Sequence, residues 1–290
     1  MCELLGLSSD APATVNLSLM ELAEHGGHSG PHRDGWGVAY YEGPDLRLIK
    51  EAAAAADSDW VRFVRDHDLR SPIVVAHVRR ATMGERSYRN SQPFARELAG
   101  RMHVFAHNGW LAGIFDAQAM QPRRFLPVGE TDSERAFCIL LDRMAELWRP
   151  GETPALDARL AIVTAFAGAL RGLGPANFLY SDGDALFAHG HRRIQAATSR
   201  VGPPGLVWIQ RRCGLGEAGI AASGLSVAGA QQSVVLLASV PLTDEPWHAL
   251  GEGEVIAVRG GEVAGRRFPA EDETCVASWQ PVGLCSSTGC

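Results

Sequence analysis

The sequence lacks an apolar run of membrane-spanning length, an excess of basic residues and an export signal. A helix that crosses a bilayer needs roughly 18 or more apolar residues in a row, so we expect no membrane span. The net charge is -6, with 27 Lys and Arg against 33 Asp and Glu. Nucleic-acid binding requires clustered cations, so we expect no nucleic-acid partner. The opening Met-Cys-Glu-Leu-Leu-Gly-Leu has no basic segment before its apolar residues, which predicts a cytoplasmic protein.

Metal-binding motifs are also lacking. No CxxC pair and no HExxH helix pair occurs, so we expect no metal and no cofactor. His25, His28 and His32 lie in a glycine-rich stretch, which indicates a flexible segment near the site rather than a set of ligands. In a long chain without an export signal, most cysteines are expected to be reduced. The six cysteines are Cys2, Cys138, Cys213, Cys275, Cys285 and Cys290.

The chain does contain many short apolar runs rich in Val, Tyr and Phe, a composition that favours strands. The runs are residues 4–7, 36–41, 73–78, 102–106, 177–180, 185–189, 206–210, 234–240 and 255–258. Asp182-Gly183 and Gly260-Gly261 predict hairpin turns. The alanine run at 52–56 indicates a turn of helix or a loop.

Two helices are predicted between the early and the late strands. The segment Thr-Asp-Ser-Glu at 131–134 has the form of a capping box, and apolar residues then recur at helical spacing as far as Trp148. A second helix is predicted over 156–170. Strands, then helices, then strands favour an α+β fold of two packed sheets covered by helices. Residues 271–290 have weak periodicity, so we expect an irregular C-terminal tail after a domain over residues 1–270.

Cys2 is the first candidate for chemistry. Removal of Met1 would leave Cys2 with a free α-amine beside its own thiol. The thiolate is the nucleophile, and an α-amine with an ordinary pKa of about 7.7 can take its proton. One residue would then supply both nucleophile and base. The alternative is a buried thiol at the start of the first strand.

Two charged residues could recognise a small amino acid. Arg79 leaves the end of the run 73–78, and an arginine there can grip a carboxylate with two parallel hydrogen bonds. Asp132 stands at the first position of the predicted helix, where its carboxylate could receive a substrate ammonium. Each has a structural alternative, which is a surface salt bridge for Arg79 and a favourable interaction with the helix dipole for Asp132.

Asn108-Gly109 follows the run 102–106 and offers donors to an oxyanion. The asparagine amide and the glycine N–H could both point at a tetrahedral oxygen, and glycine permits close backbone approach. The alternative is a plain turn, because Asn-Gly is a common turn dipeptide.

Taken in order, these elements resemble the class II glutamine amidotransferases, which are N-terminal nucleophile hydrolases. The opening Met-Cys-Glu-Leu-Leu-Gly, the segment His-Arg-Asp-Gly-Trp-Gly at 32–37 and the helix start at 127–134 are similar to a small stand-alone branch of that family. The resemblance runs from Met1 to about Phe268 and implies a four-layer αββα fold with two stacked antiparallel sheets.

The resemblance also implies a role for each candidate. Cys2 would attack the γ-carboxamide of glutamine to form a thioester, which water resolves to glutamate. Asn108 and Gly109 would form the oxyanion hole. Two further residues would bind the α-amino acid part of the substrate. Arg79 would hold its α-carboxylate, and Asp132 would hold its α-amine. Thr82 lies where the family's R-x-A-T loop approaches substrate.

The sequence leaves several questions open. The chain has no room for a synthase domain, so any acceptor of the ammonia would be another protein. The substrate could instead be a larger γ-glutamyl amide, as in relatives that act in thiol metabolism, or the domain could be catalytically silent. Many such relatives self-associate, so the resemblance leaves a homo-oligomer possible, but no feature of the sequence indicates an interface. Gln92 and Met83 depart from the family pattern, where histidines are common.

Overall fold

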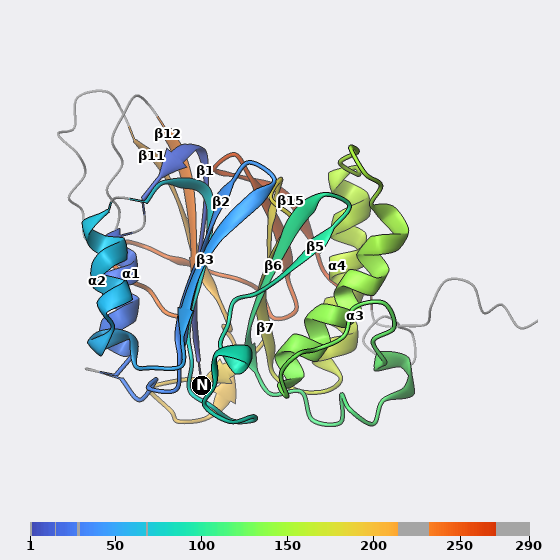
Figure 1. Ribbon diagram of the computed structural model, residues 1–290, viewed down its shortest axis with the longest axis horizontal. Coiled ribbons are helices and arrows are strands. Elements are labelled where there is room, and N and C mark those ends of the chain that lie inside the picture. The colour runs from blue at the N-terminus through green and yellow to red at the C-terminus, as the bar shows by residue number, and fades with distance from the viewer. Residues whose placement is uncertain (1, 15, 28–29, 68, 214–231, 271–290) are drawn as a thin grey trace, which may run out of the picture.

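The computed structural model describes residues 2–14, 16–27, 30–67, 69–213 and 232–270. Two antiparallel sheets stack face to face, and a pair of helices covers each outer face (Figure 1). This is the four-layer α+β arrangement that the sequence predicts. The predicted tail at 271–290 lies outside the described residues, so the boundary at 270 stays a prediction.

The first sheet has the strand order β13-β11-β12-β1-β4-β2-β3, with β1 at its centre. The register pairs Glu3 with Val78 on one side of β1 and Leu5 with Ala238 on the other. The strands are β1 (Glu3–Ala13), β2 (Trp36–Glu42), β3 (Asp45–Glu51), β4 (Ser71–Val78), β11 (Val207–Cys213), β12 (Gln232–Ala238) and β13 (His248–Ala249).

The second sheet has the order β15-β14-β8-β7-β6-β5. Asn108 and Gly109 end β6 and pair with Asn177 and Ala176 of β7. The strands are β5 (Phe94–Leu98), β6 (Arg101–Gly109), β7 (Ala176–Ser181), β8 (Leu186–His189), β14 (Val255–Arg259) and β15 (Glu262–Arg267), and a separate pair is formed by β9 (Arg193–Ile194) and β10 (Val201–Gly202).

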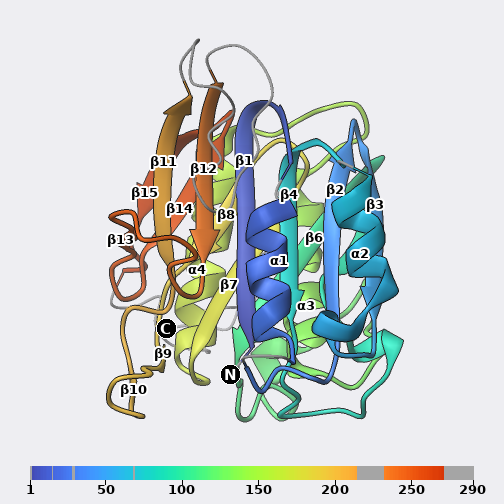
Figure 2. The same cartoon turned by 90° about the vertical axis from the view of Figure 1, so that its left-hand side faces the viewer.

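Each outer face is covered by two helices. The helices α1 (Asn16–His25) and α2 (Asp59–Asp66) lie across the first sheet, as Figure 2 shows from that side. The helices α3 (Asp132–Leu147) and α4 (Leu156–Arg171) cover the second sheet. Short 3-10 turns are η1 (Ala55–Asp57), η2 (Tyr88–Asn90) and η3 (Gln118–Met120).

Strand β1 is buried on both faces because it lies between two apolar layers. Leu4 points into the core between the sheets, together with Val75 and Leu179. Leu5 and Leu7 point the other way, into the core under α1 and α2. This double burial explains why the start of the chain reads as a continuous apolar run rather than an alternating one.

The predicted strands and both predicted helices are present. The two hairpin turns also form, and η1 accounts for part of the alanine run. Helices α1 and α2 were not predicted. The flexible-loop interpretation was wrong for His25, which ends α1 and hydrogen-bonds through Nδ1 to the Glu3 carboxylate at 2.7 Å. His28 lies outside the described residues.

The predicted capping box at α3 forms only in part. Thr131 Oγ1 accepts the Glu134 N–H at 3.2 Å, as predicted. The Glu134 carboxylate, however, accepts the Gly129 N–H at 2.6 Å and pairs with Arg96 instead of returning to Thr131. The segment before α3 is therefore folded back onto the helix start, which fixes the position of Asp132.

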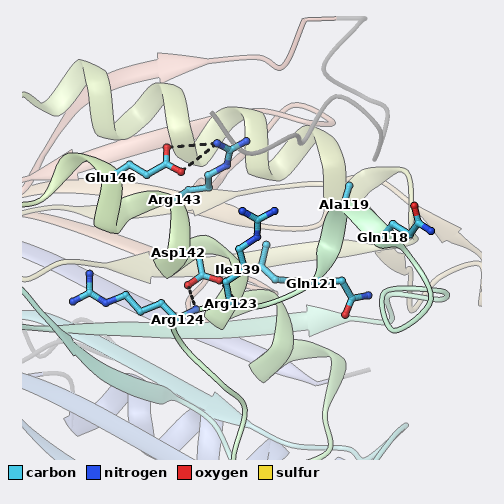
Figure 3. A pocket seen from close by; sticks show the side chains of 9 residues that line it. All are labelled: Gln118, Ala119, Gln121, Arg123, Arg124, Ile139, Asp142, Arg143 and Glu146. Atoms are coloured by element: carbon cyan, nitrogen blue, oxygen red, sulfur yellow. Dashed lines mark hydrogen bonds and ion pairs between the residues drawn. The ribbon is translucent and has the colours of Figure 1, made fainter. Parts of the chain in front are cut away.

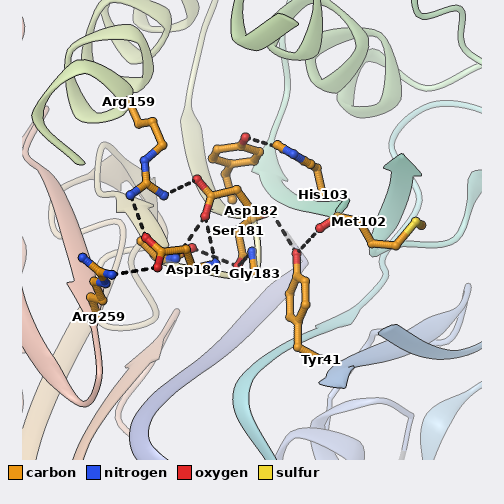
Figure 4. A network of polar contacts seen from close by, with 11 residues as sticks. Tyr41, Met102, His103, Arg159, Ser181, Asp182, Gly183, Asp184 and Arg259 are labelled. Carbon is orange, nitrogen blue, oxygen red and sulfur yellow. Dashed lines mark hydrogen bonds and ion pairs between the residues drawn. The ribbon is translucent and has the colours of Figure 1, made fainter. Parts of the chain in front are cut away.

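A buried ionic network lies at the end of the second sheet where β7 turns into β8 (Figure 4). Arg159 of α4 is 1% exposed and donates to Asp182 and Asp184, each at 2.7 Å. Asp182 Oδ1 also accepts the N–H groups of Asp184 and Ala185, which shapes the turn between β7 and β8. The network therefore joins α4 to the predicted Asp182-Gly183 hairpin.

Replacing Asp182 by Ala should destabilise the fold strongly, because it leaves the Arg159 guanidinium buried with one partner fewer. Removing one partner of a buried pair costs about 3–5 kcal/mol. Denaturant unfolding should show a loss of this size, with a much smaller loss for Asp157→Ala, whose exposed carboxylate pairs with Arg267 at the surface. Equal losses for both variants would contradict this assignment.

Candidate functional site

Cys2 lies at the start of the central strand, opposite the end of β4. Its Sγ accepts the Arg80 N–H at 3.3 Å and lies 3.3 Å from the Arg80 carbonyl oxygen, to which the thiol donates. Cys2 as a residue is partly exposed, whereas Cys138 is completely buried. The predicted nucleophile is therefore a free thiol held against the backbone of Arg80.

The electrostatic surroundings of Cys2 include the other predicted charged residues. Burial raises the pKa of the Cys2 thiol, whereas the Arg80 N–H and the Arg79 guanidinium lower it and the Asp132 carboxylate raises it. The net direction is upward, so the thiol is mainly protonated at neutral pH and needs a base to react. Arg79 and Asp132 are near enough to Cys2 to act on its charge.

Arg79 is buried, and its guanidinium donates hydrogen bonds to the loop that follows it. Its Nη1 donates to the carbonyls of Asp34 at 3.3 Å and Glu85 at 3.1 Å. Its Nη2 donates to the carbonyls of Met83 at 2.9 Å and Gly84 at 3.2 Å. The predicted alternative of a surface salt bridge is wrong, because the guanidinium is 3% exposed and its Nη groups donate to backbone oxygens.

The segment before β2 holds the same loop from the other side. Asp34 Oδ2 accepts the Ala81 N–H at 2.8 Å, and the Asp34 N–H donates to the Arg79 carbonyl at 3.1 Å. The motif at 32–37 therefore fixes the chain on both sides of Arg80. Thr82, two residues further, is exposed.

Asn108 is fully buried at the end of β6. Its Nδ2 donates to Ser239 Oγ at 3.3 Å, and its carbonyl accepts from Asn177 Nδ2 at 3.0 Å. Its Oδ1 is buried and has no partner in the described part of the chain. The turn interpretation of Asn108-Gly109 was wrong, because both residues pair with β7 as part of the strand.

Gly109 occupies a position where no side chain fits. A Cβ built there would lie 1.8 Å from the Pro175 carbonyl oxygen and 2.7 Å from His107 Nε2. The tight contact arises because β6 and β7 stay paired as far as Gly109 and Ala176. Glycine is therefore required by the close approach of the two strands.

Asp132 begins α3 and is 4% exposed. Its Oδ2 accepts the Leu111 N–H at 2.9 Å, and its Oδ1 accepts the Ser133 N–H at 2.8 Å. The Ser133 hydroxyl lies 2.9 Å from His107 Nδ1, next to Asn108. These contacts fix the start of α3 against the end of β6.

Several residues that complete the site were not predicted. Asn177 of β7 and Ser239, directly after β12, contact Asn108, and neither has a sequence signal of its own. The Gln92 side chain bonds both backbone groups of His107, accepting the N–H through Oε1 at 2.7 Å and donating to the carbonyl through Nε2 at 3.2 Å. Gln92 therefore keeps the end of β6 in place.

A separate hollow lies on the outer side of α3 (Figure 3). It has a volume of about 220 Å³, and none of the six predicted site residues lines it. The Asp142 carboxylate there accepts the N–H groups of Arg123 at 2.6 Å and Arg124 at 2.9 Å, so it serves to hold the loop before α3. The hollow is distinct from the surroundings of Cys2.

The described ranges contain no cluster of three or more His, Cys, Asp or Glu side chains suited to a metal ion. Within the same ranges, no helix is long and apolar enough to cross a membrane.

Burial raises the pKa of the Cys138 thiol to about 12, so this second free cysteine is a poor nucleophile.

Comparison with known proteins places this geometry in a family. The family model for glutamine amidotransferases class-II matches residues 1–280. The chain belongs to the class II glutamine amidotransferases. The resemblance that the sequence motifs carry is thereby confirmed over nearly the whole chain.

Two relatives match this chain over nearly their whole length. The chain is 36% identical over 261 residues to the putative glutamine amidotransferase YafJ of Escherichia coli, covering 88% of this chain and 96% of that protein. It is 33% identical to a predicted glutamine amidotransferase of Pseudomonas aeruginosa of known structure, with a TM-score of 0.65 and coverage of 91% and 100%. The chain therefore spans nearly the full length of both relatives.

A more distant likeness supports the fold. Glutamine phosphoribosylpyrophosphate amidotransferase from B. subtilis is 15% identical, with a TM-score of 0.57 over 93% of this chain and 50% of that one. At this identity the likeness concerns the fold alone. It agrees with the arrangement of two stacked antiparallel sheets covered by helices.

Replacing Gly109 by Ala should destabilise the protein, because the new methyl group would overlap the Pro175 carbonyl, a backbone atom that cannot rotate away. Overpacking typically costs about 1–3 kcal/mol, and we expect the upper part of that range. Gly202→Ala is the matched control, because a Cβ added at Gly202 would have no neighbouring atom within 4 Å. Denaturant unfolding that gave the two variants equal stability would refute the steric argument.

Proposed function

We propose that the protein hydrolyses the γ-carboxamide of glutamine to glutamate and ammonia, with Cys2 as an N-terminal nucleophile. The observation that carries the proposal is the convergence on Cys2 of one buried cation, Arg79, and one buried anion, Asp132, both of which act on the charge of the thiol. An α-amino acid presents the complementary pair, a carboxylate and an ammonium. Family membership supports glutamine as the amino acid.

The proposed nucleophile needs a base because burial raises the pKa of its thiol. Removal of Met1 would supply one, since the α-amine of Cys2 is then free to take the thiol proton. Sγ attacks the carbonyl carbon, and the tetrahedral intermediate collapses as the C–N bond breaks. The α-amine returns its proton to the leaving nitrogen, and water then attacks the thioester to release glutamate.

Asn108 and Gly109 are proposed to stabilise the oxyanion. The Asn108 amide has two N–H groups, and one is used by Ser239. The second is available to a tetrahedral oxygen, together with the Gly109 N–H. Because the ends of β6 and β7 are fixed by pairing and by Gln92, these donors are held in place before substrate arrives.

Substrate binding by Arg79 requires a change in the loop after it. The two Nη atoms of Arg79 donate four hydrogen bonds to backbone carbonyls, those of Asp34, Met83, Gly84 and Glu85. A substrate carboxylate would bind through Nε or would displace loop carbonyls. We therefore expect residues 83–85 to move on binding, and Thr82, which lies in the same exposed loop, to come within reach of substrate.

The ammonia would pass to an acceptor on another protein. The family match covers residues 1–280, and the description of the family as amidotransferases implies transfer of the amide nitrogen to an acceptor. A synthase partner is therefore part of the proposal, and glutamate release without the partner would be the half-reaction that this chain performs alone.

Cys2→Ala should abolish glutamate release and leave the fold intact. The substitution removes the nucleophile, while the neighbouring contacts of β1 are made by its backbone and by apolar side chains. Glutamate release from L-glutamine should be measured for wild type and variant, with mass spectrometry to establish that Met1 is absent. Cys138→Ala is the control, because its buried thiol should not contribute.

Three results would redirect the proposal. Full activity of Cys2→Ala would exclude Cys2 as the nucleophile. Release from a larger γ-glutamyl amide, but not from glutamine, would replace the substrate while keeping the mechanism. A wild type that lacks Met1 and is inactive on both compounds would identify a silent domain.

Asp132→Asn should raise KM for glutamine by about tenfold or more, with a smaller effect on kcat, because a hydrogen bond to a charged group contributes about 1.5–3 kcal/mol. Asp142→Asn is a matched control on the same helix, since its carboxylate also accepts backbone N–H groups but lies away from Cys2. Steady-state kinetics should show an unchanged KM for the control. A KM unaffected in Asp132→Asn would exclude its role in ammonium binding.

A further inference from the structure

Ser239 lies directly after β12 and is 4% exposed. Its hydroxyl accepts two hydrogen bonds, from the Leu4 N–H at 3.0 Å and from Asn108 Nδ2 at 3.3 Å. Leu4 belongs to the strand that carries Cys2, and Asn108 ends a strand of the other sheet. One oxygen atom therefore links the strand of the proposed nucleophile to the side chain of the proposed oxyanion donor.

The position of this oxygen is fixed by the backbone around it. The Ser239 N–H donates to the Leu4 carbonyl at 3.1 Å, so residues 4 and 239 form a reciprocal pair at the end of β12. The Ser239 carbonyl also accepts from Arg193, whose side chain is largely buried. The hydroxyl therefore cannot move without disturbing β1.

Apart from Ser239, few hydrogen-bond partners orient the Asn108 side-chain amide. Asn177 holds the Asn108 carbonyl at 3.0 Å, which fixes the backbone but not the amide. Oδ1 is buried and unpartnered within the described ranges, and Ser239 Oγ is the partner that the structure gives to Nδ2. The rotation of the amide is therefore controlled mainly by the Ser239 hydroxyl.

We propose that Ser239 is a positioning residue, whose hydroxyl holds the Asn108 amide so that its second N–H faces the oxygen of the carbonyl group that Cys2 attacks. The inference rests on the proposed function. An oxyanion donor stabilises the transition state only if it is already aimed at the developing charge. Loss of the hydroxyl should therefore lower kcat and leave substrate binding by Arg79 and Asp132 almost unchanged.

Ser239→Ala should lower kcat by about tenfold or more, below the 10²–10³-fold loss typical of removing an oxyanion donor itself, with KM within about twofold of wild type. Ser239→Thr, which keeps the hydroxyl, should recover part of the loss. Ser181→Ala is the matched control, because Ser181 is fully buried, makes two hydrogen bonds through Oγ and stands at the far end of β7. It should reduce stability and leave kcat unchanged.

The second arm places Ser239→Ala in an Asn108→Ala background. If Ser239 acts through Asn108, its removal costs no further activity there. A tenfold additional loss in that background, or wild-type kcat in Ser239→Ala alone, overturns the proposal. If Ser239→Ala does not fold, Ser239→Cys, with a weaker acceptor of similar size, has to show the same drop in kcat; wild-type kcat in the folded Cys variant equally overturns it.

A readout independent of turnover separates this inference from the proposed function. The Asn108 side-chain amide signal in a ¹⁵N spectrum, assigned by its loss in Asn108→Ala, should shift or broaden in Ser239→Ala but not in Ser181→Ala. A wild type that releases no glutamate contradicts the proposed function alone. An amide signal unchanged by Ser239→Ala contradicts the positioning role whatever the activity.

Discussion

The antiparallel pairing of β1 with β4 sets the positions of the groups around Cys2. Because Glu3 lies opposite Val78, Cys2 is placed against Arg80, and the guanidinium of Arg79 comes close enough to influence the thiol. A slip of one residue would move Leu4 from the inter-sheet core to the helix-covered face and reverse every side chain of the strand. Burial of β1 on both faces makes such a slip costly, so the core that stabilises the fold also fixes the proposed nucleophile.

The second sheet contributes the complementary half of the site. Its strands β6 and β7 remain paired to their ends, and the contact is so close that only glycine fits at residue 109. His107 and Leu111, on either side of this end, bond to the first residues of α3 and hold Asp132. The proposed donors and the proposed ammonium ligand therefore form one rigid unit. In the proposed mechanism, the loop held by Arg79 is the part of the candidate site that substrate has to rearrange.

Local patterns predicted most of the elements, because strands and helices here have clear apolar periodicity and strong end signals. The start of α3 followed from the Thr131 cap. Helix α1 had a signal in the spacing of Leu19, Leu22 and Ala23, but the neighbouring glycines and histidines favoured a loop. Ser239 could not be predicted, since its bond to Asn108 spans 131 residues and a lone serine carries no pattern. Asn108-Gly109 reads as a turn until pairing with β7 is known, and the family resemblance, not the dipeptide, indicated its proposed role.

The proposed mechanism requires that the mature N-terminal cysteine performs the chemistry. It can be tested by labelling with a glutamine analogue that carries an electrophilic diazoketone in place of the carboxamide, followed by peptide mass spectrometry. If Cys2 is the nucleophile, a single adduct forms on Cys2, in a peptide that begins at residue 2, and excess glutamine protects against it. An adduct on another cysteine, or none on a protein that lacks Met1, would rule out this mechanism.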